Sequence, residues 1–487
     1  MCYGRLVRSE SVEPGEVVSA FRDDVLGAAD AVEIARRIRL GEISASEAVE
    51  AAIRRAENVN PSLNAIATPL FESARVSASA PPPGAFGGVP SFIKDTDEVA
   101  GAPLLFGSRG LPHEPSKKDS PFVEQFLSLG LINLGKTTTP EFGLTGTTEA
   151  LVYGPTHNPW KSGFSPGGSS GGSAALVAAG VVPIAHANDG GGSIRIPASC
   201  CGLVGLKPSR GRVAEIEGSE LFPVKIVHQG MVSRTVRDTA SFFHGAEQYR
   251  RNPKLPEIGL VTHPGEPLRV GFFAALGDQT PAHPECVAAV HDAAALCESL
   301  GHRVEEVAIP FDDGFHEDFF LLWATMAFAI TRFGKRLIHP AFDRTKVEPF
   351  TEGLARYCKD HALAVPMAIW RLRRFAARHD RQFDRYDVLM NPTLAMPPPE
   401  LGFIGPQVPF DTALERLKWF IPFTPVQNVY GGPAISLPLS KSSSGLPIGV
   451  QFAARLGRER TLLELALEIE AAAPWPTLAS GRSPRSR

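Results

Sequence analysis

The sequence predicts an α/β protein: a single large domain with a mixed β-sheet core that is covered by helices on both faces. Three observations support this prediction. Residues 268–273, 284–300 and 302–309 have the patterns of a strand, a helix and a strand, and this order implies a crossover between two parallel strands. Residues 386–390 and 434–439 are short apolar runs that are typical of buried strands. The long central part of the chain contains no Pro-rich linker that would divide it.

The first part of the chain is predicted to be helical. Residues 28–60 have helical periodicity, and Ser44 and Glu47 are spaced as a capping box at the start of a helix. We expect Pro61 to end this helical run, because proline lacks the backbone N–H that a helix needs. A Pro-rich break at residues 80–84 follows and separates this region from the rest.

These signals divide the chain into three segments. Residues 1–84 are expected to be an N-terminal helical arm packed on the core, and residues 85–475 to be the main domain. Residues 476–487 are rich in Pro, Ser, Gly and Arg, so we expect a disordered tail there.

Within the main domain, residues 131–135 are predicted to form a short buried strand, and residues 173–179 a helix of small residues. An amphipathic helix is predicted over residues 461–473, close to the end of the chain. Its inward face is formed by four apolar residues, namely Leu462, Leu465, Ala466 and Ile469.

Composition limits the possible partners. The 487 residues include 49 Lys+Arg and 52 Asp+Glu, and the formal net charge is −3. This balance gives no indication of a nucleic-acid or membrane partner, so we expect a small-molecule substrate. The start of the chain lacks the apolar region of a signal peptide, and residues 319–330, the longest apolar run, are too short to cross a bilayer of about 30 Å. We therefore expect a cytoplasmic protein that acts as a monomer or a homodimer.

The cysteines indicate a reducing compartment, because the six of them are scattered and form neither a C-x-x-C motif nor a disulfide framework. Cys200 and Cys201 are interpreted as buried small residues and not as nucleophiles. The sequence contains no H-E-x-x-H motif and no Cys/His cluster. We therefore expect neither a metal nor a cofactor.

Two glycine loops that contain serine carry the chemical signal. Residues 167–173 read GGSSGGS and residues 189–195 read DGGGSIR, while Lys94 lies upstream in the segment 89–95, VPSFIKD. Successive glycines let backbone N–H groups converge on a small anionic oxygen, because no Cβ atom blocks the approach. Such donors are what the tetrahedral intermediate of acyl transfer requires. Together the three segments are typical of a Ser-Ser-Lys hydrolytic site.

A serine hydroxyl attacks an amide only when a base removes its proton. Lysine has an ordinary pKa of about 10.4, so it can be that base only if burial holds it neutral near pH 7. Lys94 follows an apolar segment, which is compatible with burial. Asp95 would favour the charged form if it reached the amine, but neighbouring side chains of a strand point to opposite faces.

Several segments of the chain resemble the amidase signature family. The strongest matches are residues 88–95, 135–143, 165–173 and 189–208, and weaker matches occur at 432–438 and 445–451. The resemblance extends from about residue 28 to residue 475. It implies the amidase signature fold, with residues 85–475 as the catalytic domain. It also implies an amidase that hydrolyses a carboxylic acid amide through an acyl-enzyme intermediate.

The resemblance also implies roles for individual residues. Ser193 matches the nucleophile, Ser169 the bridging serine that relays its proton, and Lys94 the terminal base. The family holds the bridging serine after a cis peptide bond, here between Gly168 and Ser169. The backbone N–H groups from Gly190 to Ser193, including those of Gly191 and Gly192, would form the oxyanion hole. Two further positions match supports of this loop, namely Asp189 and Arg195.

The chain departs from the family pattern just before the nucleophile loop. Where the family usually has Gly-Thr-Asp, this chain has Ala187, Asn188 and Asp189, followed by three glycines. This variant is similar to the branch that contains the 6-aminohexanoate cyclic dimer hydrolases, which favours a cyclic or bulky amide as substrate. We expect residues 142–153 and 319–328 to contribute to the acyl pocket. The aromatic residues of the second segment can be either pocket wall or core, and core is favoured: Phe319, Phe320, Trp323 and Phe328.

Other assignments remain open. Residues 167–171 also satisfy G-x-S-x-G, the nucleophile elbow of an α/β-hydrolase-type esterase in which Ser169 would attack. Residues 162–166 are not strand-like, which disfavours this assignment. The glutaminase subunit of a tRNA-dependent amidotransferase shares the Ser-Ser-Lys site but needs a partner, and a non-catalytic binding protein is a further alternative. His157 and His186 are interpreted as ordinary loop or core residues.

Overall fold

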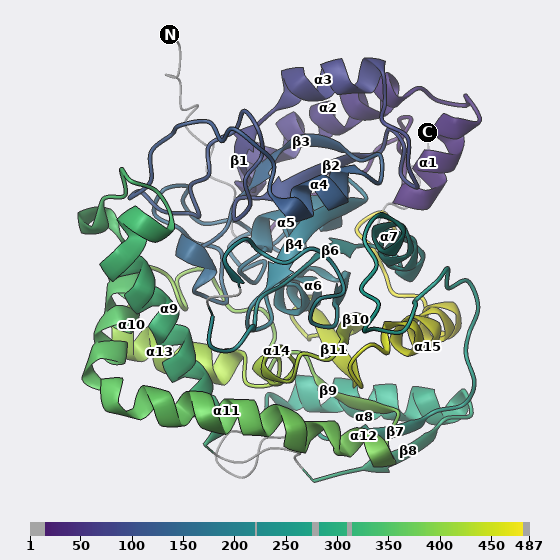
Figure 1. Cartoon of the computed structure of the whole chain (residues 1–487). Coiled ribbons are helices and arrows are strands. Elements are labelled where there is room, and N and C mark those ends of the chain that lie inside the picture. The colour runs from purple at the N-terminus through teal and green to yellow at the C-terminus, as the bar shows by residue number, and fades with distance from the viewer. Residues whose placement is uncertain (1–14, 220–221, 275–281, 309–313, 481–487) are drawn as a thin grey trace.

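The computed structural model of the chain describes residues 15–219, 222–274, 282–308 and 314–480 (Figure 1). Within these residues the helices are α1 (Ala31–Arg39), α2 (Ala45–Leu63), α3 (Phe71–Ser79), α4 (Pro121–Leu127), α5 (Gly171–Ala179), α6 (Arg195–Cys201), α7 (Val236–Tyr249), α8 (Pro284–Ser299), α9 (Phe315–Leu337), α10 (Pro349–Asp360), α11 (Val365–Asp380), α12 (Gln382–Arg385), α13 (Phe410–Phe420), α14 (Pro425–Tyr430) and α15 (Glu459–Ala472). The strands are β1 (Ile66–Pro69), β2 (Pro90–Lys94), β3 (Ile132–Thr137), β4 (Ile184–Asp189), β5 (Val204–Lys207), β6 (His228–Ser233), β7 (Arg269–Phe272), β8 (Arg303–Glu306), β9 (Val388–Pro392), β10 (Ala434–Lys441) and β11 (Pro447–Ala454).

The core of the molecule is an eight-stranded sheet with the order β4-β6-β5-β10-β11-β9-β7-β8. The strands from β4 to β9 pair antiparallel, whereas β9, β7 and β8 pair parallel. The predicted crossover is confirmed as β7–α8–β8, and the predicted mixed sheet is confirmed as well. The last residue of the predicted segment 302–309 lies outside the described residues.

Helices cover both faces of this sheet. Successive side chains of a strand point to opposite faces, and every residue of β4, β5, β6, β9 and β11 is buried. Figure 1 shows α7 and α15 on one side of the molecule and the group α9, α10, α11 and α13 on the other. The predicted inward face of α15 is confirmed, because Leu462, Leu465, Ala466 and Ile469 are all buried.

A second sheet of three strands has the order β1-β3-β2 and brings the N-terminal region to the core. Strand β2 lies against β4, the edge strand of the large sheet, through two hydrogen bonds that involve side chains. Ser91 Oγ donates to the backbone oxygen of Ile184 over 2.8 Å, and the backbone N–H of Lys94 donates to His186 Nδ1 over 3.1 Å. The two sheets therefore meet beside Lys94.

The N-terminal helices follow the sequence signals with one difference. The capping box of Ser44 and Glu47 is present at the start of α2. The predicted stop at Pro61 is wrong, because α2 continues to Leu63. Asn60 explains the difference: its Oδ1 accepts the N–H groups of Ala65 and Ile66, just beyond the helix end, at 2.9 and 3.0 Å. The side chain of Asn60 therefore closes the end of α2 two residues beyond Pro61.

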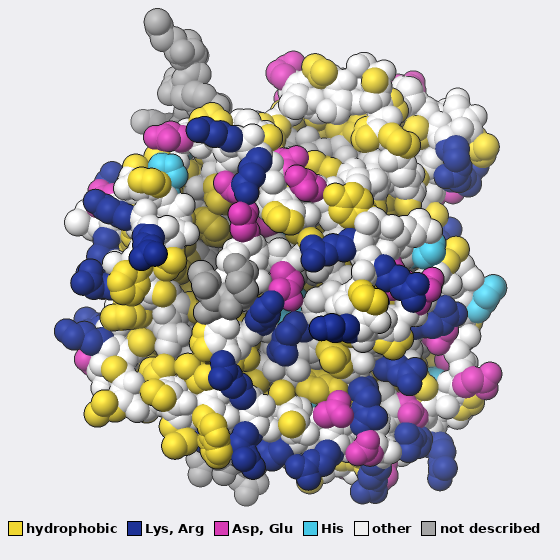
Figure 2. Space-filling view, viewed as in Figure 1, with side chains coloured by type: hydrophobic (Ala, Val, Ile, Leu, Met, Phe, Trp, Pro, Cys, Tyr) yellow, Lys and Arg dark blue, Asp and Glu magenta, His cyan; other side chains and the backbone are white. Residues whose placement is uncertain are grey.

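The boundaries of the three predicted segments stay predictions. Strand β1 belongs to the predicted arm, yet it pairs with β3, and one hydrophobic core includes residues from both sides of the boundary at residue 84. Of the predicted tail 476–487, residues 481–487 lie outside the described residues. The helices in the described part of the chain are too short or too polar to cross a membrane. Figure 2 shows acidic and basic side chains interspersed over one face of the molecule.

Candidate active site

Lys94 is the last residue of β2, and its side chain is fully buried. Asp95 does not approach its amine, as the strand alternation predicted. Instead, Asp95 Oδ1 lies 2.5 Å from Lys136 Nζ, and its carboxylate also accepts the hydroxyl of Tyr153. The carboxylate that follows Lys94 in the sequence is therefore neutralised by a different lysine.

The Lys94 amine makes two short polar contacts. Its Nζ is hydrogen-bonded to Ser169 Oγ at 2.7 Å and to Asn188 Oδ1 at 2.6 Å. Burial lowers the pKa of Lys94 to about 7, and the negative charges of Asp97 and Asp189 oppose part of this effect. At neutral pH a large fraction of the amine is therefore uncharged and can accept a proton.

Ser169 lies in the glycine loop directly before α5. The peptide bond between Gly168 and Ser169 is cis, as the family resemblance implied. A Cβ atom on Gly168 would lie only 2.7 Å from the backbone oxygen of Thr147, so this loop packs too closely for any larger residue. In the described structure no strand leads into Ser169, since residues 162–168 lie outside the named strands. The strand of a nucleophile elbow is therefore missing.

Ser193 lies in the loop between β4 and α6. It is 6% exposed and lines a small cavity together with Gly143. Ser169 does not line the cavity itself, but its Oγ would lie 3.1 Å from a Cβ atom on Gly143. Among the described residues, Ser193 Oγ has no hydrogen-bond partner, so it is not hydrogen-bonded to Ser169 Oγ, whose partner is Lys94 Nζ. The hydroxyl that the sequence identifies as the nucleophile therefore remains available to a substrate.

A buried ion pair holds the loop that carries Ser193. Arg195 Nε and Nη2 donate to the two carboxylate oxygens of Asp189, each over 2.9 Å, and both side chains are fully buried. Burial alone would raise the pKa of Asp189, but the Arg195 guanidinium outweighs it and lowers this pKa. The pair joins the end of β4 to the start of α6. Asn428 completes it, because its side chain contacts both partners.

Each glycine of the loop has a packing reason. A Cβ atom on Gly190 would lie 3.1 Å from Trp323, and one on Gly191 would lie 3.0 Å from Phe319. Gly192 has a φ of +134° and donates its N–H to Asp189 Oδ1 over 2.7 Å. Gly190 and Gly191 therefore let the aromatic face of α9 pack directly on the loop, whereas Gly192 lies against Thr424 and Ile196.

The α9 aromatic residues combine the two alternatives that the sequence left open, cavity wall and core. Phe319, Phe320 and Trp323 are buried, and they also line the cavity beside Ser193. Trp323 Nε1 donates to the backbone oxygen of Leu144 over 3.1 Å, so the indole N–H is already engaged. Phe328 is absent from the lining and is partly buried against the core. The full lining is Gly143, Leu144, Thr145, Gly146, Gly191, Ser193, Ile196, Phe319, Phe320, Trp323, Leu417 and Ile421.

The cavity is small and uncharged. Its free volume is about 10 Å³, which is close to the minimum for one water molecule. An acyl group can enter only if the surrounding side chains move. None of the lining residues carries a charge, so the cavity favours apolar groups. Residues 143–146 contribute to it, in agreement with the expected location of the acyl pocket.

Asn188 is a site residue that the sequence did not assign. Its Oδ1 accepts from Lys94 Nζ, and its Nδ2 donates to Thr96 Oγ1 over 2.6 Å. The only signal in the sequence was that Asn188 departs from the usual family pattern, and this departure indicated a substrate class and not a contact with Lys94. Contact with the lysine amine could not be read from that departure.

Among the described residues, no histidine or cysteine side chain is hydrogen-bonded to Lys94 Nζ, Ser169 Oγ or Ser193 Oγ. His157 lies in a loop, where its Nδ1 accepts the N–H of Gly163. His186 is a buried residue of β4 whose pKa is lowered by burial. Cys200 and Cys201 are buried in α6, and burial raises the pKa of both thiols. Among the described residues, no group of His, Cys, Asp and Glu has the arrangement of a metal site.

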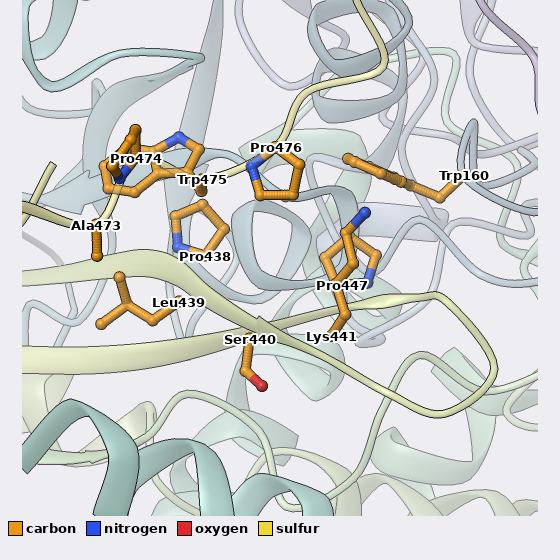
Figure 3. Close-up of a pocket in the computed structure, with 11 residues that line it drawn as sticks. Trp160, Pro438, Leu439, Ser440, Lys441, Pro447, Ala473, Pro474, Trp475 and Pro476 are labelled. Carbon is orange, nitrogen blue, oxygen red and sulfur yellow. The ribbon is translucent and has the colours of Figure 1, made fainter. Parts of the chain in front are cut away.

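A larger cavity of about 300 Å³ lies elsewhere, between β10 and the C-terminal segment (Figure 3). Its lining includes Trp160, Lys441 and Trp475, and the Lys441 amine lies 4.1 Å from the centre of the Trp160 ring. None of the three residues Lys94, Ser169 and Ser193 reaches it. We therefore place the candidate active site at the smaller cavity, which Ser193 lines and whose lining residue Gly143 lies next to Ser169, the hydrogen-bond partner of Lys94.

Comparisons with known proteins match most of the chain. The Amidase family model matches residues 47–463. The chain is 46% identical over 466 residues to a putative amidase AmiC of Mycobacterium leprae, covering 95% of this chain and 99% of that protein. It is 37% identical over 486 residues to a 6-aminohexanoate-cyclic-dimer hydrolase of Paenarthrobacter ureafaciens, covering 92% and 95% of the two chains.

The fold agrees as well. A solved structure of 6-aminohexanoate cyclic dimer hydrolase complexed with substrate matches with a TM-score of 0.83 and 35% identity, covering 94% of this chain and 98% of that one. The family match spans both glycine loops, Lys94 and most of the two sheets. The chain therefore belongs to the amidase signature family, and it is an amidase.

Proposed function

We propose that the chain hydrolyses its amide through Ser193 as nucleophile, Ser169 as proton relay and Lys94 as terminal base. The contact between the buried Lys94 amine and Ser169 Oγ, at 2.7 Å, is the observation that carries this proposal. A buried amine whose pKa lies near 7 can take a proton at neutral pH, which an ordinary lysine cannot.

The proposed reaction has two halves, acylation of Ser193 and hydrolysis of the acyl-enzyme, and neither half gains or loses a proton overall. Ser193 Oγ attacks the amide carbonyl, its proton passes to Ser169, and the Ser169 proton passes to Lys94. The tetrahedral intermediate collapses, the C–N bond breaks, and the protonated Lys94 returns a proton through Ser169 to the leaving nitrogen. Water then attacks the acyl-enzyme by the same route and releases the acid and Ser193.

We propose that the oxyanion of each intermediate accepts backbone N–H groups from the loop before Ser193. Gly192 donates its N–H to Asp189, so the donors in this proposal are Gly190, Gly191 and Ser193. The fixed position of the loop supports their role, because preorganised donors need no rearrangement when the negative charge develops.

The uncharged cavity supports a substrate class. We propose an amide with an uncharged, apolar acyl group, either linear or cyclic. The likeness to a 6-aminohexanoate-cyclic-dimer hydrolase supports the cyclic or bulky form of this proposal. Glutamine is less suited, because its charged amino and carboxylate groups would find no charged partner in the lining. This disfavours the alternative of a glutaminase subunit.

Replacement of Ser193 by Ala is expected to lower kcat/KM for amides by at least about a thousandfold, because the covalent route is lost while packing is kept. A fluorophosphonate should label Ser193 in the unmodified chain, and peptide mapping would locate the label. The matched control Ser199→Ala, which removes a hydroxyl from α6, should keep most activity. Labelling of Ser169 would contradict the assignment.

The pH dependence should report Lys94. Protonation removes the base, so kcat/KM is expected to fall about tenfold per pH unit below a pH of about 7 and to level off above it. Lys94→Ala should lose this activity at every pH, whereas Lys118→Ala, a change at an exposed lysine, should not. Near-normal activity of Lys94→Ala would exclude the mechanism.

Ser169→Ala should affect amides more than activated esters. An amide nitrogen must be protonated before it leaves, and this proton comes through the relay, whereas an activated ester has a good leaving group. We expect the loss for an amide to exceed that for its ester analogue by about tenfold or more. Parallel kcat/KM measurements on a matched anilide and phenyl ester would test this, with thermal melting to check the fold. Equal losses would count against the relay.

Substrate preference follows from the lining. Purified chain, without a partner, should hydrolyse a hexanoyl anilide with a kcat/KM at least about tenfold above that of a succinyl anilide, because a carboxylate would be buried without a partner. Trp323→Ala should shift the preference toward bulkier acyl groups, since it enlarges the cavity. A preference for the succinyl compound, or for glutamine, would contradict the proposed class.

A further inference from the structure

A closed ring of hydrogen bonds surrounds Lys94, and Asp97 is the point at which it closes. One arm starts at the amine: Lys94 Nζ contacts Asn188 Oδ1 at 2.6 Å, and Asn188 Nδ2 donates to Thr96 Oγ1 at 2.6 Å. Thr96 Oγ1 in turn donates to Asp97 Oδ2 at 3.2 Å. This arm therefore joins the amine to a carboxylate through two neutral side chains.

The other arm starts at the backbone of the same lysine. The Lys94 N–H donates to His186 Nδ1 at 3.1 Å, and His186 Nε2 lies 2.9 Å from Gln229 Oε1. Gln229 Nε2 donates to Asp97 Oδ1 at 2.8 Å, where Ser120 Oγ also donates. All members of the ring are buried or nearly so, with Thr96 the most exposed at 9%.

The carboxylate fixes the direction of every bond in the ring. A carboxylate only accepts, so Gln229 must present its NH₂ group to Asp97 and its oxygen to His186. His186 must then carry its proton on Nε2, which leaves Nδ1 free to accept the Lys94 N–H. In the first arm, Thr96 donates to Asp97, so Asn188 presents its NH₂ to Thr96 and its oxygen to Lys94.

The orientation of Asn188 determines which of its atoms faces the Lys94 amine. The Asn188 oxygen accepts one N–H of a neutral Lys94, and the lone pair of the nitrogen can then point at the Ser169 hydroxyl. If Asn188 were turned over, its NH₂ would face the amine and compete with Ser169 for the lone pair. The orientation of Asn188 is therefore required for proton transfer from Ser169.

We infer that Asp97 is a positioning residue for catalysis: through its two arms it orients the Lys94 amine toward Ser169, and its charge sets how readily the amine gains a proton. This inference rests on the proposed role of Lys94 as base. Asp97 acts through the ring and does not touch the cavity lining.

The charged groups around Lys94 define the expected effect. Asp97 and Asp189 favour the protonated amine, although Asp189 is paired with Arg195. His186 is neutral in the ring, and on the opposite face of β2 the carboxylate of Asp95 is paired with Lys136. Asp97 has an ion-pair contact with His186, whose Nε2 lies 3.8 Å from Asp97 Oδ2, and burial lowers the pKa of His186. Among the described residues, Asp97 is thus the carboxylate near Lys94 that is not paired with a lysine or an arginine.

The acid limb of the pH profile is the range over which kcat/KM falls as Lys94 gains a proton. Two variants should shift this limb in opposite directions. Asp97→Asn removes the negative charge, so the pKa of Lys94 falls and the limb should move down by about one pH unit. Asn188→Asp places a carboxylate against the amine, so the limb should move up by about one unit or more. Both variants should lower kcat more than KM, because the ring lies outside the cavity lining.

Asp384→Asn is the matched control, since it makes the same change in net charge at an exposed residue of α12 and should leave the limb in place. If both site variants fold, as judged by thermal melting, and keep the wild-type limb, the inference is wrong. If Asp97→Asn fails to fold, Thr96→Val, which removes the hydroxyl that joins Asn188 to Asp97, decides instead: a folded Thr96→Val variant with wild-type kcat would overturn the inference. An active Lys94→Ala would instead overturn the proposed base, whereas an inactive Lys94→Ala with unmoved limbs would overturn only the role of Asp97.

Discussion

The buried ion pair of Asp189 and Arg195 is the interaction on which the rest of the site depends. It closes the loop between β4 and α6, and its carboxylate also accepts the N–H groups of Gly192 and Ile194 on either side of Ser193. A buried pair of this kind adds little net stability, but loss of one partner leaves an unpaired buried charge that costs about 3–5 kcal/mol. Its contribution is therefore geometric: it holds Ser193 and the neighbouring amide groups in one arrangement.

The position of the base depends on a junction between the two sheets. Strand β2 carries Lys94, β4 leads into the Ser193 loop, and the two strands meet through His186. The same junction removes Lys94 from water, and this desolvation makes a lysine usable as a base. The aromatic residues of α9 pack on the loop from another side and form the apolar wall of the cavity. Burial thus supplies both the neutral form of the amine, which can accept a proton, and the apolar character of the cavity.

Much of the fold could be predicted from local patterns. The crossover β7–α8–β8, the capping box of α2 and the inward face of α15 each depend on residues that are close in sequence, and all three are present. The antiparallel order of the large sheet could not be predicted, because β10 pairs with β5, which lies far earlier in the chain. The end of α2 was also missed, since the Asn60 side chain offers the backbone partners that a Pro61 signal does not reveal.

The sequence by itself determined the reactive groups: the two glycine loops, Ser169, Ser193 and Lys94, recognised by residue type and spacing and supported by the family to which the chain belongs. The tertiary structure decided how these groups are tuned. It placed Asn188 against the Lys94 amine and turned Trp323 toward the cavity. Desolvation, hydrogen-bond direction and cavity shape arise from contacts between residues that are distant in the chain. For this reason a pattern of neighbouring residues indicates the proposed chemistry of this protein, whereas only the folded chain fixes the state of the Lys94 amine and the shape of the cavity beside Ser193.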